Sequence, residues 1–414
     1  MNDEQSISYA ANGGTLGITI EGSNTAAENF TLSTPNADVN LRGNGGNDLV
    51  KVTTLDFSKN LAVSGGQGDD QLTLGATVHK LDGFTSLVSF HGDAGSDTLT
   101  LDDAANLVQR NFDINAASFS FTGANGTGSV DADSALEIAN ILGGKFGTTF
   151  HVKTSNVLVG KVNIDGTAGN DVVEGPDAAS VWNVTNTNAG VLNGNVNFIR
   201  TPNLFGGSKS DRFVFANGKG VNGSILGDPG NAFGAAVADT LDYSAFTTGV
   251  TVNLKTGKAS NVGGSISAIE NVTGGIAGDV IVGNNIANII LGGAGRDVLI
   301  GGLGADAITA GADEDLLIGG TTDFDTDAIA MQAIAQAWRG AGDYLHRIAK
   351  LTTTGVGLGN AVKLTATTVH NDLTTDMLIG GEDRQDWFFA HLAVGGPLPG
   401  IDVTDFSSEI ERNG

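Results

Sequence analysis

The sequence contains no cysteine, and proline and basic residues are scarce. Without Cys, the 414-residue chain can form no disulfide, thiolate zinc site or cysteine nucleophile. Its 6 Pro beside 62 Gly exclude collagen and a proline-rich linker. The 21 Lys and Arg stand against 46 Asp and Glu, which gives a formal net charge of -25. We therefore expect no nucleic-acid partner, because phosphate recognition needs basic side chains.

Long apolar runs and a visible Sec signal are also missing. No stretch approaches the roughly 18 apolar residues of a transmembrane helix, so we expect no membrane insertion. The first residues, MNDEQSISYA, have neither the basic nor the apolar region of a Sec signal. For a secreted chain this predicts export without a Sec signal, by a type I-like route. Hydrophobic residues still reach 40% of the sequence, which is enough to bury a core.

Glycine and aspartate recur together in a tandem nonapeptide. Residues 274–318 divide into GGIAGDVIV, GNNIANIIL, GGAGRDVLI, GGLGADAIT and AGADEDLLI. The sixth position holds Asp279, Asn288, Asp297, Asp306 and Asp315, and the eighth holds Ile281, Ile290, Leu299, Ile308 and Leu317. Repeats of this period indicate a solenoid.

Each part of the nonapeptide has a physical role. Glycines permit the positive φ of a tight turn and let carbonyls face a cation, and Asp at position six adds a short charged oxygen ligand. The last three residues predict a brief strand whose central side chain points inward. Two nonapeptides make one 18-residue coil, so Asp279, Asp297 and Asp315 line one edge. Asn288 and Asp306 line the other edge, with Asp323 or Asp325 as its candidate continuation.

Single copies of the same turn occur elsewhere. They begin at Gly43, Gly65, Gly92, Gly166 and Gly206, and two degenerate copies begin at Asn371 and Gly381. Across these twelve copies, position six is Asp eleven times and position eight is always apolar. The candidate Ca²⁺ ligands are Asp48, Asp70, Asp97, Asp171, Asp279, Asp297, Asp306 and Asp315. For any single copy, the alternative is a β-turn whose Asp caps its own backbone.

These residues resemble the hemolysin-type (RTX) calcium-binding repeats of secreted bacterial proteins. The stretch 239–275 is similar to a linker that often precedes such repeats, and 316–338 with TTVHND and DWFFA is similar to their C-terminal helix-bearing module. The resemblance implies a secreted protein with a calcium-binding β-roll. Position four departs from Gly at Lys209, Ala277, Ile286, Asp313, Thr374 and Arg384, and we expect these turns to bind calcium poorly.

The predicted fold class is all-β, a parallel β-helix or β-roll solenoid with one C-terminal helix. We divide it into an irregular solenoid at 1–225, a linker and strand segment at 226–273, an RTX β-roll at 274–324 and a C-terminal module at 325–414. The spacings of 22 and 27 residues between Asp48, Asp70 and Asp97 suit irregular coils. Residues 134–142 fit a helix or a strand.

The C-terminal helix is expected at 325–350. Its predicted apolar stripe is Ile329, Ile334, Trp338, Leu345 and Ile348, with a break near Gly340–Gly342. We interpret it as a helix that packs over the roll rather than one that binds a cofactor.

Enzyme motifs are not apparent. The sequence has no H-E-x-x-H, no G-x-S-x-G and no G-x-x-x-x-G-K-[ST], and its six His are scattered. The carboxylate pairs Asp69–Asp70 and Asp102–Asp103 lie in or beside glycine turns, where they suit calcium ligation or solvation. We expect no enzyme, with a polysaccharide-modifying β-helix enzyme as a less favoured alternative.

The favoured function is a secreted, extracellular, calcium-binding structural protein. It would fold on meeting calcium and assemble end to end with copies of itself into a filament, matrix or surface layer. The alternative is an adhesin or glycan-binding module that binds cell-surface or matrix glycans.

Overall fold

The computed structural model describes residues 4–6, 18–21, 29–32, 38–54, 59–123, 126–133, 136–155, 160–230, 237–381, 385–389 and 403–404. The chain forms two compact units, Met1–Val181 with Thr187–Gly207 and Trp182–Asn186 with Ser208–Gly414. Strands far outnumber helices in the described ranges, which confirms the all-β fold.

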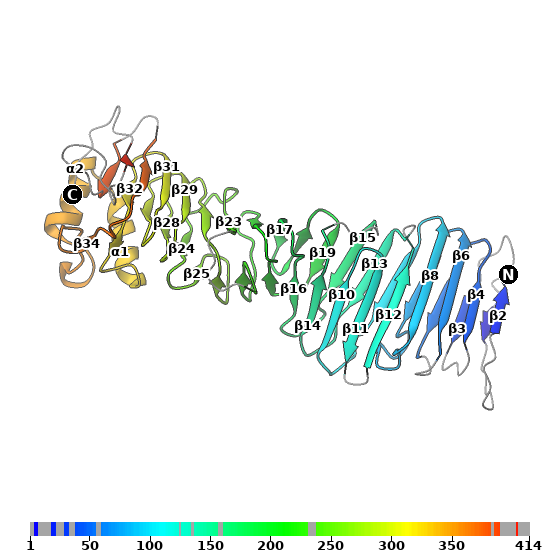
Figure 1. The fold of residues 1–414 in the computed structure, drawn as a ribbon. Helices are drawn as coiled ribbons and strands as arrows, with labels where there is room; N and C mark the ends of the chain where they lie inside the picture. Colours follow the sequence, from blue (N-terminus) through cyan, green and yellow to red (C-terminus); the bar gives the residue numbers. More distant parts are fainter. Residues whose placement is uncertain are drawn as a thin grey trace. The chain divides into compact units, whose positions relative to one another are not determined.

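The first unit winds two sheets from successive parallel strands (Figure 1). One sheet runs β1 (Glu4–Ser6), β3 (Asn29–Leu32), β5 (Leu49–Val52), β7 (Gln71–Leu74), β9 (Thr98–Asp102), β13 (Ile138–Leu142), β15 (Lys161–Asp165) and β19 (Val196–Ile199), with β18 (Ala189–Leu192) antiparallel to β19. Within the stretch 134–142, Ile138–Leu142 thus form a strand rather than a helix.

The second sheet of this unit lies opposite in the coil. It runs β2 (Ile18–Glu21), β4 (Val39–Arg42), β6 (Leu61–Gln67), β8 (Leu87–Ala94), β12 (Gly126–Ala132), β11 (Ser118–Gly123), β10 (Arg110–Ile114), β14 (Thr148–Val152), β16 (Val172–Glu174) and β20 (Asn203–Phe205). Strand β11 is antiparallel to both β10 and β12, and the other pairs are parallel.

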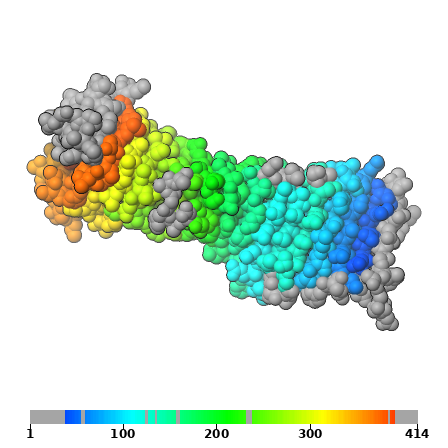
Figure 2. Space-filling view, in the orientation of Figure 1, coloured from blue at the N-terminus to red at the C-terminus, as the bar shows by residue number. Residues whose placement is uncertain are grey.

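Strand register confirms the irregular coils. Leu49 pairs with Gln71 and Gln71 with Thr98, which are steps of 22 and 27 residues. Alternating side chains such as Val39 and Leu41 point inward and are buried, as half-buried strands require. In the space-filling view, the coils between residues 38 and 132 follow one another in chain order, blue to cyan (Figure 2).

The second unit contains the regular roll. One sheet runs β17 (Ser180–Asn186), β21 (Asp211–Phe215), β23 (Thr240–Asp242), β27 (Asn271–Thr273), β29 (Ile289–Ala294), β31 (Ala307–Ala312), β35 (Met377–Ile379) and β37 (Val403–Thr404). The other runs β25 (Lys258–Ala259), β24 (Thr251–Asn253), β28 (Val280–Val282), β30 (Val298–Ile300), β32 (Leu316–Ile318) and β36 (Trp387–Phe389). Two short pairs are β22 (Ile225–Leu226) with β26 (Ile266–Ser267) and β33 (Thr321–Thr322) with β34 (Val369–His370).

The roll has the predicted 18-residue step. Val280 pairs with Val298, and Val298 pairs with Leu316. After β32 the chain leaves the roll, and it returns at β35, where Met377 pairs with Ala307 in a register step of 70 residues. The degenerate copies at Asn371 and Gly381 therefore add coils to the same roll.

The excursion contains the helices. They are α1 (Ala328–Trp338), α2 (Tyr344–Ala349), a π-helical turn at Lys350–Thr354 and a 3₁₀ turn at Leu358–Asn360. Asp327 caps α1, because its carboxylate accepts the N–H groups of Ile329 and Ala330. No helix in the described ranges is long and apolar enough to cross a membrane.

Helix α1 packs on the outer face of β28, β30 and β32 (Figure 1). Every side chain of these three strands is buried, because the roll interior covers one face and the helix covers the other. The predicted stripe is partly wrong. Ile334 and Trp338 are buried, but Ile329 is 77% and Leu345 is 51% exposed. The buried stripe also uses Ala330 and Met331, so the helix is rotated from the predicted face.

Candidate calcium-binding turns

The residues at positions six and eight are buried in all twelve copies. Position eight is at most 4% exposed and position six at most 3%. The apolar residue fills the coil interior, as the repeat predicts. The burial of so many carboxylates is unusual, because a buried charge needs partners.

The position-six side chains form ladders along the two edges of the roll. On the first edge, the backbone N–H of Asp279 donates to Oδ1 of Asp297 at 2.6 Å, that of Asp297 to Asp315 at 2.8 Å, and that of Asp315 to Asp386 at 2.7 Å. Each carboxylate thus accepts an amide from the preceding coil.

On the second edge, the N–H of Asn288 donates to Oδ1 of Asp306 at 2.8 Å, and that of Asp306 donates to Asp376 at 2.9 Å. Neither Asp323 nor Asp325 continues this edge. Asp323 pairs with His370 and Asp325 with Lys255, because the chain leaves the roll before reaching them.

The first unit has ladders of the same kind. The N–H of Asp48 donates to Oδ1 of Asp70 at 2.7 Å, that of Asp70 to Asp97 at 2.8 Å, and that of Asp97 to Oε2 of Glu137 at 2.7 Å. Separately, the N–H of Thr148 donates to Oδ1 of Asp171 at 2.6 Å.

Three members of these ladders were not expected from the sequence. They are Glu137, Asp239 and Glu270. Asp376 and Asp386 occupy position six of the degenerate copies but were not among the candidate calcium ligands. Glu137 and Glu270 replace Asp outside any nonapeptide, and Asp239 follows a turn without the glycine spacing. Their shared signal is an acid immediately before a parallel strand, as Glu137 precedes β13.

The turns fall into two geometries. In the first, positions two and four are both left-handed, as with Gly293 (φ 109°) and Gly295 (φ 96°) before Asp297. Among the described residues, this geometry precedes Asp48, Asp70, Asp97, Asp171, Asp297, Asp306 and Asp315. Asp313 adopts φ 81° at position four, so a non-Gly residue there does not abolish the turn.

The second geometry occurs before Asp279 and Asn288, where positions two and four stay outside the left-handed region. The turn amide then caps the side chain. The N–H of Gly275 donates to Oδ2 of Asp279 at 2.6 Å, and that of Asn284 donates to Oδ1 of Asn288 at 2.9 Å. These two turns match the alternative to a calcium-binding turn, a turn in which the position-six side chain caps its own backbone.

In five of these left-handed turns, one oxygen of the aspartate carboxylate has no hydrogen-bond partner among the described residues. Within the described part of the chain, the buried Oδ2 atoms of Asp70, Asp97, Asp171, Asp297 and Asp315 accept no hydrogen bond. Burial, with repulsion from Asp279, raises the pKa of Asp297 to about 8, and burial with repulsion from Asp297 raises that of Asp315 to about 10. Burial likewise raises the pKa of Asp97 and of Asp171 to about 6.

The donor set fits calcium. Ca²⁺ is a hard cation that takes about six to eight oxygen ligands, including carboxylates and backbone carbonyls. Within the described ranges, the turns of Asp70, Asp97, Asp171, Asp297 and Asp315 provide an unsatisfied carboxylate oxygen beside stacked turn carbonyls. In the described ranges no group of three or more His, Asp or Glu side chains is placed to hold a metal ion, so turn carbonyls would have to complete the coordination.

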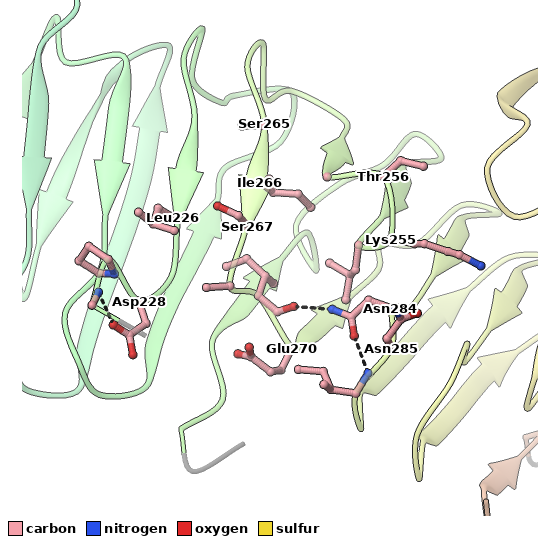
Figure 3. A pocket seen from close by; sticks show the side chains of 17 residues that line it. Leu226, Asp228, Lys255, Thr256, Ser265, Ile266, Ser267, Glu270, Asn284 and Asn285 are labelled. Atoms are coloured by element: carbon pink, nitrogen blue, oxygen red, sulfur yellow. Dashed lines mark hydrogen bonds between the residues drawn. The ribbon is translucent and has the colours of Figure 1, made fainter. Parts of the chain in front are cut away.

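The second unit also has a cavity of about 800 Å³ beside these turns (Figure 3). Its walls include Leu226, Lys255, Ile266 and Asn284. Glu270 lines it too, but Oε2 of Glu270 accepts the N–H of Asp239 at 2.8 Å. This carboxylate therefore belongs to a ladder, and burial raises its pKa.

The carboxylate pair Asp102–Asp103 is engaged in ion pairs. Asp103 binds Nε of buried Arg110 at 2.8 Å, and Asp102 binds Nδ1 of His79 at 2.5 Å. Through these contacts, Asp102 and Asp103 join segments of the first unit. In the other pair, Asp69 accepts the N–H of Ser96 at 2.8 Å, which joins neighbouring turns.

The parallel coils, the 18-residue step and the aspartate turns together define an RTX-like β-roll module, of the kind found in secreted bacterial proteins. Residues 231–384 match the family described as Peptidase M10 serralysin C terminal. The repeats of such C-terminal domains bind calcium in general.

A curated relative supports the same class. The chain is 43% identical over 60 residues to Metallopeptidase AprA of Pseudomonas marginalis. The similarity covers 13% of this chain and 13% of the length of that relative. It supports an extracellular location.

The expectation that the chain belongs to no enzyme is contradicted by these similarities. Both the family match and the named relative point to a protease family, although the matched stretch is short. No catalytic motif revealed this similarity, because the family match lies in the roll and the helices.

Proposed function

We propose that this chain is a secreted RTX-type protein whose β-roll is folded and held by calcium. The observation that carries the proposal is the buried, unsatisfied Oδ2 of Asp297 and of Asp315 in stacked left-handed turns. Leaving a buried polar atom without a partner is costly, and a divalent cation removes that cost. Calcium outside the cell would then complete folding after export. We propose that this export follows a type I-like route.

The residues proposed to hold calcium are those of the left-handed turns: Asp48, Asp70, Asp97, Asp171, Asp297, Asp306 and Asp315. Bound calcium would supply charge neutralisation and oxygen coordination at the stacked edges. The chain itself supplies the carboxylates, the glycine turns that expose carbonyls, and the apolar position-eight residues that bring the coils together.

The test is a calcium titration of the chelated protein. We expect far-UV circular dichroism to gain β-signal and the melting temperature to rise as calcium is added, with magnesium as the control ion. Unchanged spectra and melting in excess EGTA would contradict the proposal.

We further propose that copies associate end to end into an extracellular filament, matrix or surface layer. Within the described residues, β1 pairs only with β3 and β2 only with β4, so each keeps an edge that can pair with another strand. A second copy of the chain is the partner that we propose for this edge.

A further inference from the structure

The first coil of the roll, residues 274–291, differs from later coils at both of its turns. Oδ1 of Asp279 accepts the N–H of Val250 at 2.6 Å and Oδ2 accepts that of Gly275 at 2.6 Å. Both oxygens of this buried carboxylate are therefore satisfied by amides. At the other turn, Nδ2 of Asn288 donates to the carbonyl of Glu270 at 2.8 Å, so this neutral side chain is satisfied too.

A protein cation lies on the edge that carries Asp279. Arg339 follows directly after α1, and its Nε donates to the carbonyl of Arg296, position five of the third copy, at 3.3 Å. The same side chain lies against Gly278, position five of the first copy, where an added Cβ would meet Nε at 2.6 Å. Arg339 thus bridges the turns of Asp279 and Asp297 while keeping part of its surface in solvent.

The charges agree with this placement. Burial lowers the pKa of Arg339, and the negative charges of Asp279 and Asp297 oppose that effect. In return, Arg339 opposes the rise that burial causes in the pKa of each carboxyl. The next turn on this edge is bound by the helix as well, because Nε1 of Trp338 donates to the carbonyl of Glu314 at 3.0 Å.

We propose that the first coil is a calcium-free rung of the roll, in which Arg339 acts as a tethered cation on one edge and the neutral Asn288 removes the need for a cation on the other. The inference rests on the proposed calcium-dependent folding and refines it. Calcium binding then begins in the second coil, at Asp297 and Asp306, and continues in the next coil at Asp315. The first coil forms the surface on which the calcium-dependent coils assemble, and helix α1 docks together with those coils.

The first test compares Asp279→Asn with Asp297→Asn in the full chain. The natural Asn288 shows that a turn of this geometry accepts Asn. We expect Asp279→Asn to retain the wild-type number of bound calcium ions, measured by metal analysis and titration calorimetry, and Asp297→Asn to lose at least one. Equal losses in the two variants would overturn the inference while leaving the proposed function intact. Wild-type protein that binds no calcium would instead overturn the proposed function, and the inference with it.

The second test removes the tethered charge. Arg339→Gln should raise the calcium concentration at half-folding by about two- to fivefold, the range for a partly exposed charge interaction. Arg339→Lys keeps the charge and should stay closer to the wild type. Near-UV circular dichroism in saturating calcium checks that both variants fold. A midpoint for Arg339→Gln equal to that of the wild type would show that the arginine only packs, and would overturn its role.

Discussion

At the scale of single residues, the glycine at position one makes room for the carboxylate at position six. A Cβ on Gly292 would lie 2.4 Å from Oδ2 of Asp297, and one on Gly301 would lie 2.4 Å from Oδ2 of Asp306. The fifth copy has Ala310 in this place, and its Asp315 has the most strongly raised pKa among those given above. Position one therefore needs a small residue that leaves room for the carboxylate. Positions two and four instead need a residue that can adopt positive φ.

Gly295→Ala should destabilise the roll more than Gly359→Ala. Both glycines have a left-handed φ, 96° and 65°, so each variant loses about 1 kcal/mol from that conformation. At Gly295 the new Cβ would also lie 2.4 Å from the backbone nitrogen of Gly278, whereas at Gly359 nothing lies within 4 Å. Chemical denaturation in calcium measures the difference. A smaller loss at Gly295 than at Gly359 would contradict the close stacking of coils.

Asp297→Ala should lose more calcium than Asp211→Ala. Asp297 follows a left-handed turn and has an unsatisfied Oδ2. Asp211 follows a turn with Lys209 at position four, outside the left-handed region, and its Oδ1 accepts Nε1 of Trp182 at 3.3 Å. Titration calorimetry on the two variants gives the number of ions lost. Equal numbers of calcium ions lost from the two variants would contradict this ranking.

At the scale of elements, the ladders couple folding to pH. The raised pKa values of Asp297 and Asp315, about 8 and about 10, mean that the calcium-free native state holds protons that the unfolded chain has released. Between about pH 4 and pH 8, its stability should fall as pH rises, by about 1.4 kcal/mol per pH unit for each such carboxyl. Asp97 and Asp171 add to the same trend at the acid end.

Denaturant titrations of the calcium-free protein at pH 5 and pH 7 measure this slope, and Asp297→Asn should reduce it. With calcium present the trend should reverse, because protons then compete with the ion and binding releases them. Calcium-free protein that is more stable at pH 7 than at pH 5 would contradict the raised pKa values.

Chelation should release helix α1 together with the coils that it covers. The helix packs on Val298, Ile300 and Leu316, so loss of β30 and β32 removes its docking surface. Hydrogen exchange after EGTA should show lost protection in β29–β32 and in α1, with the antiparallel β11–β12 pair as the internal control. A helix that stays protected while β30 and β32 exchange would show that the two are uncoupled.

At the scale of the whole molecule, the proposed assembly depends on the strands that begin the first unit. Removal of residues 1–40 deletes β1, β2 and β3, and leaves only Leu41 and Arg42 of β4, without their partners in β2. We expect the full chain to form calcium-dependent assemblies in light scattering and the truncated chain to remain monomeric yet bind calcium. Assemblies that persist unchanged after truncation, or a full chain that stays monomeric at high concentration, would contradict end-to-end pairing. Glycan binding on an immobilised array would favour the adhesin alternative.

The sequence by itself determined the repeat, its 18-residue step, the all-β solenoid and the partition of Asp279, Asp297 and Asp315 from Asn288 and Asp306. These follow from local rules, because glycine permits left-handed turns and an apolar position eight must face the interior. The 22- and 27-residue coils near Asp48 follow from the same spacing.

Only the tertiary structure decided which carboxylates have amide partners and which keep an unsatisfied oxygen. Those partners come from other coils, such as the N–H of Val250 for the carboxylate of Asp279, or from 70 residues away, such as the N–H of Asp306 for the carboxylate of Asp376. The face of α1 was also decided there, because the roll offers a sheet wide enough for Ala330 and Met331 as well as Ile334. Residues far apart in sequence set the electrostatics of each turn, and no local pattern encodes that distance.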